Sequence, residues 1–370
     1  MKILYAVSLF SGLLESVKTR KWNPTGAPTI YKMIERLDSE DVEFVFCATE
    51  KIDGFRWIKK IYLNGLMHPV WIVPYFKNRI LREFVRTYFL CKLHRKEGFD
   101  KAYFNNGLLF PAAWFTRRKH CKVIFRIMGV YPSMWKTLER KSIIQRLESA
   151  AYASHFWYVI CTEDGSGGPE WMQKMLSVKY IPVRTLLNGV DETGHEIVQT
   201  KKPMILWVGQ LKKDKGCLEF SKAISILRDK YPGRFLTVVI GDGPELEYMA
   251  CEMFSLDTKF ISKIPHDEIH KWYNSCDLYV SLNKLGHLSN TNLEAIASGC
   301  PIVMLEPEYK TLYDNLLDGC LFVSRNNTVD GLVGVFEEML RHHGFGLREP
   351  VKIWSWENRI NEELKIIGDI

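Results

Sequence analysis

Short apolar runs alternate with longer amphipathic segments along the whole of this 370-residue chain. In the first half, five runs predict buried strands: KILYAVSLF, VEFVFCA, KAYFNN, KVIFRIM and FWYVICT. The second half repeats the pattern with MILWVGQL, FLTVVIGDG, DLYVSLN, PIVML and CLFV. Runs this brief, rich in β-branched and aromatic residues and bounded by polar ones, are typical of buried strands.

Helical patterns separate the predicted strands. They cover 28–37, roughly 76–96, 215–230, 245–254, 266–275 and 292–298. Alternation of strands and helices predicts parallel sheets joined by crossover helices, and two such series predict an α/β protein with two doubly wound domains. Because ligands bind at the carboxyl ends of strands in such sheets, we expect the site in the cleft between the domains.

Formal charge changes sign between the two halves. Residues 1–190 hold 30 Lys and Arg against 16 Asp and Glu, whereas residues 191–370 hold 20 against 27. The basic half favours an anionic partner, such as a phospholipid surface, a lipid pyrophosphate or nucleic acid. No nucleic-acid-binding motif accompanies this charge, so we expect no nucleic acid partner.

The cysteines and the apolar segments predict a cytoplasmic protein. Nine cysteines are dispersed without a C-x-x-C pair or a His/Cys cluster, which is typical of reduced thiols. The first run, MKILYAVSLFSGLLES, lacks the features of a signal peptide and is predicted to be a strand. No apolar stretch approaches the roughly 20 residues of a membrane-spanning helix.

A glycine turn and a basic loop follow one predicted strand, in LWVGQLKKDKGCLEF (206–220). Lys215 and Gly216 stand where the next helix begins. A lysine beside the positive end of a helix dipole is suited to binding an anion, and the alternative is a solvated turn. The glycines of VVIGDGPE match neither G-x-G-x-x-G nor a Walker motif and predict only a tight turn.

A single carboxylate stands near the start of the helix predicted in NKLGHLSNTNLEAIASGC. Thr291 and Glu294 have the spacing of a capping box, in which Glu294 would bond the backbone amide of Thr291. The alternative is that Glu294 binds a ligand. Spacing alone leaves both interpretations open.

The order of VGQLKKDKG, VVIGDGPE, FISKIPHDEIHKWYNSCDLYVSLN and NLEAIASGCPIVML resembles the nucleotide-sugar half of family 4 glycosyltransferases, which have the GT-B fold. The segments LLNGVD and WSWENRINEELKII fit the same pattern. The resemblance is strong over 186–370 and looser over 1–185. It implies a Rossmann-like acceptor-binding domain (1–187), a Rossmann-like nucleotide-sugar-binding domain (188–352) and a terminal helix (353–370) that packs on the first domain.

The resemblance implies how the donor is held. The family's diphosphate-binding Arg and Lys correspond to Gln210 and Lys215, which follow Gly209, and the stretch that contacts the base corresponds to Lys263 and Ile264. No D-x-D pair is present. We therefore expect Lys215 and helix-terminal amides to stabilise the leaving diphosphate, with no metal or other cofactor.

Two family glutamates correspond to Glu294, which would bind the ribose, and to Gly286, where a sugar-contacting glutamate is expected. Backbone amides at the helix start would hold the diphosphate or the sugar instead: those of Asn290, Thr291 and Asn292.

Other candidates lie in the first half. The family's glycine-rich turn near the donor phosphates corresponds to Gly26, with Gly12 as the alternative, in the long loop expected after the first strand. The acceptor-side candidates follow two predicted strands: Arg126, Gly129, Thr162 and Glu163. The alternative for these four is that they belong to ordinary strand-end loops.

The segment 75–96 predicts a basic amphipathic helix. One face carries Arg79, Arg82 and Arg86, and the other carries Ile80, Phe84, Tyr88 and Cys91. The basic face would give peripheral contact with an anionic membrane, on the cytoplasmic side. The alternative is a surface helix with a solvated basic face.

These features predict a hexosyl- or related glycosyltransferase of polysaccharide or glycoconjugate biosynthesis, with a nucleotide-sugar donor of UDP or GDP type and a glycan or lipid-linked acceptor. The resemblance implies retention of anomeric configuration. Two alternatives stay open: a nucleotide-sugar 2-epimerase of the same fold, and a non-catalytic protein that kept the fold. The epimerase would leave the basic half without a role, whereas Gln210 and Gly286 motivate the non-catalytic alternative.

Overall fold

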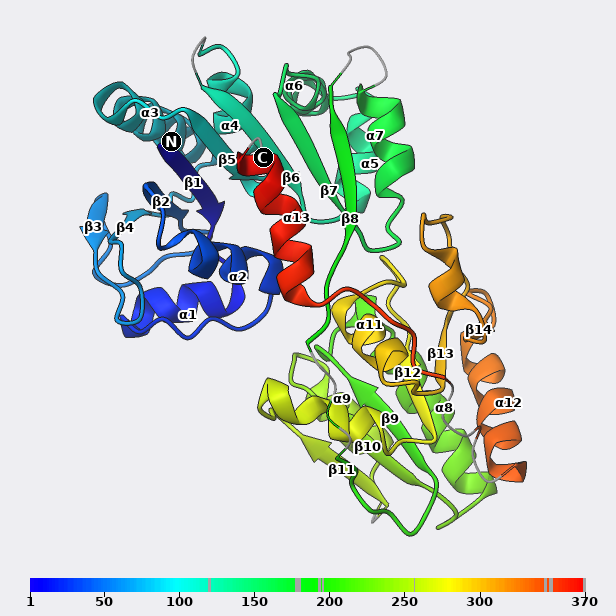
Figure 1. The fold of residues 1–370 in the computed structure, drawn as a ribbon. Helices are drawn as coiled ribbons and strands as arrows, with labels where there is room; N and C mark the ends of the chain where they lie inside the picture. Colours follow the sequence, from blue (N-terminus) through cyan, green and yellow to red (C-terminus); the bar gives the residue numbers. More distant parts are fainter. Residues whose placement is uncertain are drawn as a thin grey trace. The chain divides into compact units, whose positions relative to one another are not determined.

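The computed structural model describes residues 1–118, 121–176, 181–191, 194, 196–255, 257–342, 345 and 349–368. The chain forms two compact units (Figure 1). Unit 1 comprises Met1–Thr162, Gly168–Leu187 and Trp356–Ile370, and unit 2 comprises Glu163–Gly167 and Asn188–Ser355. The C-terminal helix therefore belongs to unit 1, whereas the loop 163–167, assigned to the first domain from the sequence, belongs to unit 2.

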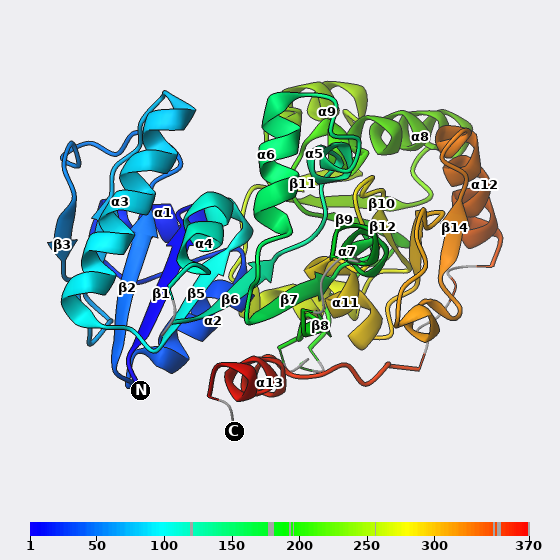
Figure 2. The same ribbon diagram turned by 90° about the horizontal axis from the view of Figure 1, so that it is seen from above.

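Unit 1 is built on an eight-stranded sheet in the order β3-β4-β2-β1-β5-β6-β7-β8, most of which can be followed in Figure 2. Its strands are β1 (Ile3–Ser8), β2 (Val42–Cys47), β3 (Lys59–Ile61), β4 (Val70–Val73), β5 (Lys101–Asn105), β6 (Lys122–Ile127), β7 (Tyr158–Glu163) and β8 (Val183–Leu187). Neighbours from β4 to β7 pair in parallel, and β3 runs antiparallel to β4. All five strands predicted in this half are present, and β3, β4 and β8 were not predicted.

Helices cover both faces of this sheet. One apolar core lies beneath α3 (Arg79–Glu97), α4 (Leu109–Phe115), α5 (Pro132–Thr137), α6 (Ile143–Tyr152) and α7 (Gly168–Leu176). The opposite core lies beneath α1 (Ser11–Thr19), α2 (Pro28–Leu37) and α13 (Trp356–Gly368). Strand β1 is buried along its whole length, because its side chains alternate between the two cores. The segment after β1 was expected to be a loop, but Ser11–Thr19 within it form helix α1.

The C-terminal helix α13 is held to the sheet by a buried ionic cluster. Glu363 of α13 lies 3.4 Å from Arg126 Nε of β6 and 2.7 Å from Arg359 Nη1 one turn earlier. The hydroxyl of Tyr103 on β5 donates a hydrogen bond to the same carboxylate. Burial alone would raise the pKa of Glu363, but the two arginines hold that pKa below its ordinary value.

This cluster corrects two acceptor-side predictions. Arg126 is completely buried, and its Nη2 donates to Thr162 Oγ1 at 2.6 Å. Thr162 is buried as well. Both side chains therefore make contacts in the interior of unit 1 and are not exposed at the rim of a binding site.

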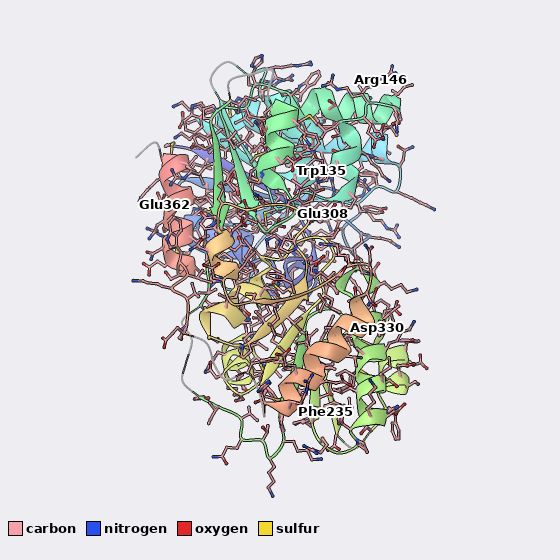
Figure 3. The ribbon with its side chains drawn as sticks, turned by 90° about the vertical axis from the view of Figure 1, so that its right-hand side faces the viewer. Trp135, Arg146, Phe235, Glu308, Asp330 and Glu362 are labelled. Atoms are coloured by element: carbon pink, nitrogen blue, oxygen red, sulfur yellow. The ribbon has the colours of Figure 1, made fainter. Side chains whose placement is uncertain are left out.

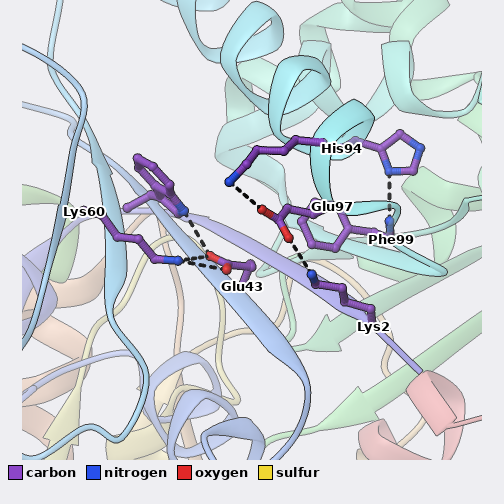
Figure 4. A network of polar contacts seen from close by, with 8 residues as sticks. Lys2, Glu43, Lys60, His94, Glu97 and Phe99 are labelled. Atoms are coloured by element: carbon purple, nitrogen blue, oxygen red, sulfur yellow. Dashed lines mark hydrogen bonds and ion pairs between the residues drawn. The ribbon is translucent and has the colours of Figure 1, made fainter.

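Other ion pairs link Lys2, next to β1, to α3, and link β2 to β3 (Figure 4). Lys2 Nζ is 2.6 Å from Glu97 of α3, and Lys60 Nζ lies 2.8 Å from Glu43. These pairs are partly exposed, and pairs of this kind contribute about 0–1 kcal/mol each. The buried cluster around Glu363 is therefore the ionic contact that matters more to unit 1.

Unit 2 is built on a six-stranded, entirely parallel sheet in the order β11-β10-β9-β12-β13-β14. Its strands are β9 (Met204–Val208), β10 (Leu236–Ile240), β11 (Thr258–Ile261), β12 (Leu278–Ser281), β13 (Ile302–Leu305) and β14 (Leu321–Val323). The connecting helices are α8 (Cys217–Lys230), α9 (Leu246–Glu252), α10 (Ile269–Tyr273), α11 (Asn290–Ala297) and α12 (Thr328–Arg341). Short 3₁₀ turns are η1 (Asn106–Leu108) in unit 1, and η2 (Lys213–Lys215), η3 (His266–Glu268) and η4 (Asp314–Leu317) in unit 2. The five predicted strands are present, whereas β11 and α12 were not predicted.

None of the helices in the described ranges is long and apolar enough to cross a membrane.

We expect Glu363→Ala to destabilise unit 1 by about 3–5 kcal/mol, because it leaves two buried arginines without their carboxylate. Urea unfolding followed by circular dichroism measures the loss. The matched control is Glu362→Ala, the next residue of α13 (labelled in Figure 3), whose partly exposed pairs with Arg184 and Lys365 predict a loss below about 1 kcal/mol. Equal losses in the two variants would contradict this account of the cluster.

Candidate functional site

The donor-binding residues predicted from the sequence follow three strands of the unit 2 sheet. Gly209 and Gln210 come directly after β9, and Lys263 and Ile264 follow β11. The segment 282–289 follows β12, the neighbour of β9. Because all six strands are parallel, these loops emerge at one edge of the sheet, where ligands bind in folds of this type. These predicted donor-binding residues therefore lie at the same edge of the unit 2 sheet.

The loop after β9 packs against the glycine turn after β10. A Cβ atom at Gly241 would lie 1.9 Å from the carbonyl oxygen of Gly209, so only glycine allows this approach. The amide of Leu211 donates to the carbonyl of Asp242 at 3.0 Å. Gln210 projects from this loop and is exposed. The turn in VVIGDGPE is therefore a packing element, as predicted, and it supports the loop that carries Gln210.

Lys215 ends the 3₁₀ turn η2, directly before α8. Gly216 has a φ of 75°, and a Cβ there would lie 2.4 Å from the Cβ of Leu282, so the start of α8 is pressed against the end of β12. Burial lowers the pKa of Lys215, and the charges of Asp214 and Asp164 oppose that shift. A partly desolvated lysine at this edge is suited to bind an anionic group.

The start of α11 differs from the predicted capping box. Ser289 is the N-cap, and its hydroxyl accepts a hydrogen bond from the amide of Asn292 at 3.4 Å. The prediction that Thr291 caps the helix with Glu294 is therefore wrong, because Glu294 lies in the second turn. The amides of Asn290 and Thr291 make no hydrogen bond to any described part of the chain, and the helix dipole favours an anion there.

Asn292 cannot take the ligand-binding role expected of it. Its side chain is completely buried, with Nδ2 donating to the carbonyl of His287 at 2.8 Å and Oδ1 accepting from the Tyr279 hydroxyl at 3.3 Å. Its amide is engaged by the cap. The sequence could not separate Asn292 from Asn290, because both are amide side chains at the start of one helix. Asn290 instead accepts a bond from Asn188 Nδ2 at 2.7 Å.

Glu294 faces a small polar group at the same edge. Its side chain is 12% exposed, and Oε1 lies 3.6 Å from Nε2 of His266, which in turn lies 3.0 Å from Oδ2 of Asp191. Burial raises the pKa of Glu294 to about 7; His266 acts to lower it and Asp191 to raise it. Sequence reasoning missed His266 and Asp191, although both stand in quoted motifs, IPHDE and LLNGVD.

The loop 163–167 fills the place that the missing family glutamate would need. A Cβ atom at Gly286 would lie 2.4 Å from the carbonyl oxygen of Asp164, and that oxygen accepts a bond from the amide of Leu288 at 3.0 Å. The Asp164 carboxylate lies close enough for its charge to act on Lys215. Glycine at 286 is therefore required by this loop, which contributes carboxylates of its own.

Glu163 lies in the same loop and is corrected from an acceptor-side candidate to a residue of unit 2. Its side chain is completely buried, and Oε1 accepts a bond from the amide of Gly165 at 3.2 Å. Burial raises its pKa to about 7. The ring of His287 lies against the backbone of Gly165, and burial lowers the pKa of that histidine to about 4.

The glycine candidates of unit 1 lie where glycine is needed: Gly12, in α1, for a close approach, and Gly26 and Gly129 for a positive φ. The amide of Gly12 donates to the carbonyl of Thr25 at 3.0 Å, and a Cβ at Gly12 would lie 2.0 Å from Thr25 N, so Gly12 lies against the residue that precedes Gly26. Gly26 and Gly129 have φ values of 70° and 138°, which favour glycine. Their predicted roles toward donor phosphate and acceptor stay predictions.

The tight contact at Gly286 predicts the effect of a single methyl group. We expect Gly286→Ala to destabilise unit 2 by about 1–3 kcal/mol, because the added Cβ meets backbone that cannot move aside. Thermal unfolding measures the change. In the control, Gly334→Ala of α12, the added Cβ meets nothing within 4 Å, so the helix should gain up to about 1 kcal/mol. Unchanged stability of Gly286→Ala would show that the loop does not occupy this space.

Two sequence comparisons match part of this chain. Residues 192–315, about a third of the chain, match the family model for glycosyl transferases group 1. A segment of 105 residues is 30% identical to the sulfoquinovosyl transferase SQD2 of Arabidopsis thaliana, and it covers 28% of this chain and 20% of that protein. The matching segment is thus about a fifth of the length of this relative.

Solved structures extend the likeness to the whole chain. Sucrose-phosphate synthase from Thermosynechococcus elongatus superposes with a TM-score of 0.70 at 13% identity, over all of this chain and 99% of that one. HepE of Anabaena, in complex with UDP, superposes with a TM-score of 0.65 at 11% identity over the full length of both. At these identities the likeness concerns the fold, and the predicted GT-B fold is confirmed. The protein thus has the GT-B fold, and its residues 192–315 carry the group 1 glycosyltransferase pattern.

Proposed function

We propose that this protein transfers a sugar, of hexose or related type, from a nucleotide-sugar donor to a glycan or lipid-linked acceptor in polysaccharide or glycoconjugate biosynthesis. One observation carries the proposal. Lys215, the open amides of Asn290 and Thr291, and the buried carboxylate of Glu294 occupy the ligand-binding edge of unit 2, inside the segment that matches group 1 glycosyltransferases. The complex of HepE, a protein of similar fold, with UDP supports a nucleotide ligand.

The diphosphate is the group that these residues must stabilise. When the bond between the sugar C1 and the diphosphate oxygen breaks, negative charge develops on that oxygen. Lys215 and the amides of Asn290 and Thr291 are preorganised donors for that charge and need no metal ion. Gln210 adds a hydrogen-bond donor without charge, so Lys215 carries the larger share of the stabilisation.

The proposed transfer retains the anomeric configuration. The acceptor hydroxyl forms its bond to C1 on the same face that the diphosphate leaves, and its proton passes to the departing diphosphate oxygen. No carboxylate is required as a covalent nucleophile in this route. The loop 163–167 lies where the family's sugar-contacting glutamate would stand, so Asp164 is the carboxylate nearest to that role. The same loop gives a structural reason for Gly286, which weakens the non-catalytic alternative.

Glu294 binds the ribose in this proposal. An ionised carboxylate accepts hydrogen bonds from two vicinal hydroxyls, whereas a protonated one has lost part of this capacity. His266, 3.6 Å away, favours the ionised form and orients it. Donor binding should therefore depend on the charge of Glu294.

Removal of Lys215 should weaken diphosphate binding and abolish most turnover. We expect Lys215→Ala to lower the rate of transfer about 10²–10³-fold and to reduce affinity for the matching nucleoside diphosphate. Calorimetric titration with UDP and GDP, combined with donor-consumption assays over a panel of nucleotide sugars, measures both effects. Lys213→Ala is the control, because Lys213 lies in the same turn but is exposed. Equal behaviour of the two variants would refute the diphosphate assignment.

Nucleotide affinity should depend on pH through Glu294. With a pKa of about 7, this carboxylate is mostly ionised at pH 8 and mostly protonated at pH 6, so affinity should fall as the pH falls through 7. In Glu294→Gln the affinity should be lower at pH 8 and should lack this step. Because the nucleotide phosphates also titrate, the two proteins are compared at each pH. Parallel pH profiles would exclude Glu294 as the ribose ligand.

A further inference from the structure

An apolar groove opens on the surface of unit 1. It lies between α3, α4 and α6 and has a volume of about 880 Å³. Its floor and walls include Ile80, Phe84, Tyr88, Trp114, Ile144 and Leu147. Ile80 is 83% exposed and Phe84 is 66% exposed. Monomeric proteins rarely leave so many large apolar side chains together in water, so a surface of this kind marks a binding site.

The orientation of α3 alters the expected basic docking face. Arg86 is buried, with Nη2 donating to the carbonyl of Ala48 at 2.8 Å, and Arg79 is paired with Glu148 of α6. The apolar face of the helix is the exposed one. Arg86 is therefore removed from the predicted basic face, whereas Arg79 stays half exposed, and contact with an anionic membrane stays a prediction. The helix presents Ile80, Phe84 and Tyr88 to its surroundings, while Arg86 points into the interior of unit 1.

Those arginines line a second, polar pocket next to the groove. The pocket has a volume of about 440 Å³ and lies at the carboxyl ends of β1 and β2, beside Ser8, Thr49, Asn106, Arg79, Arg82 and Arg86. Nε of Arg86 is buried and has no hydrogen-bond partner among the described residues. Glu83 and Glu148 line the pocket too and pair with these arginines, so one net positive charge remains. Ligands bind at this edge of parallel sheets, and the remaining positive charge favours an anionic one. Groove and pocket are neighbours, since Arg79, Glu83 and Phe110 line both.

We propose that the groove and the pocket together bind a lipid-linked acceptor. Its hydrocarbon chain lies in the groove between α3, α4 and α6, and its anionic phosphate head lies in the arginine pocket. This inference rests on the proposed function and names the class of acceptor: an amphiphile with a phosphate between chain and sugar-accepting group. It also gives a reason for the excess of basic residues in the first half of the chain.

The shape and charge of the groove favour a lipid over a second copy of the chain. Two concave grooves facing each other across a two-fold axis would leave their centres unfilled. Such a pair would also bring together the arginines that line each groove, Arg79, Arg95 and Arg118. A flexible hydrocarbon chain fills a groove without these costs, and a phosphate head complements the neighbouring arginines.

Dodecyl phosphate, used below its micellar concentration, tests this inference by calorimetric titration of the full chain. We expect saturable binding of dodecyl phosphate and none of inorganic phosphate over the same range. Phe84→Ser should weaken dodecyl phosphate at least tenfold, because it removes a large apolar contact. The control is Phe254→Ser, which removes an 84% exposed phenylalanine from unit 2 and should leave the affinity unchanged. Arg82→Gln should also weaken dodecyl phosphate but leave a neutral dodecyl glycoside unaffected.

Several results would overturn the inference. Equal affinity for dodecyl phosphate and inorganic phosphate, or equal losses in Phe84→Ser and Phe254→Ser, would remove the groove from binding. Binding to anionic vesicles without binding of the monomeric lipid would make the groove a membrane contact, and a dimer that Phe84→Ser dissociates would make it an interface between copies. UDP and GDP binding by Phe84→Ser should equal that of the unaltered protein. If the unaltered protein binds dodecyl phosphate but no nucleotide, the proposed function fails while the lipid site stands.

Discussion

The parallel direction of all six strands in unit 2 is the constraint on which its chemistry depends. All six strands end at the same edge of the sheet, so loops that are far apart in the sequence emerge there together. The adjacency of β9 and β12 sets the start of α8 beside the segment that leads into α11, through the contact of Gly216 with Leu282. Lys215 and the open amides of α11 therefore owe their common edge to the strand order.

The elements that the sequence predicted well are those whose burial leaves a pattern in the local sequence. Strands such as β1 and β9 are buried and continuous, and α2 was predicted over its full observed range because Pro28 marks its first residue. The missed strands are short or partly exposed: β3 has three residues, two of them exposed, and β11 is only half-buried. Their place is decided by pairing with a neighbouring strand, which no local pattern records.

Only the candidate site residues that belong to an ordered series of sequence motifs could be predicted. Lys215 and Glu294 follow from motif order, but the loop 163–167 comes to Gly286 from another part of the chain, and no spacing reveals that approach. Ser289 and Thr291 are both reasonable N-caps, and only the structure shows that Ser289 is used. Arg126 stands at a strand end like the candidate residues of unit 2, yet the C-terminal helix covers it. The periodicity of residues 75–96 predicted a basic face and an apolar face for α3, but it does not show which face packs against the rest of unit 1.

Several ionisable groups of unit 2 lie in surroundings that disfavour their charge. Burial raises the pKa of Glu163 and of Glu294 to about 7 and lowers the pKa of Lys215, so each group is held in surroundings that disfavour its charge. Raised carboxyl pKa values mean that the folded state binds more protons than the unfolded state between about pH 4.5 and 7, so these groups destabilise the fold as the pH rises through that interval. A chain selected for stability alone would not keep them. Such groups fit the proposed site, which would bind an anion and a hydroxylated sugar in partial isolation from water.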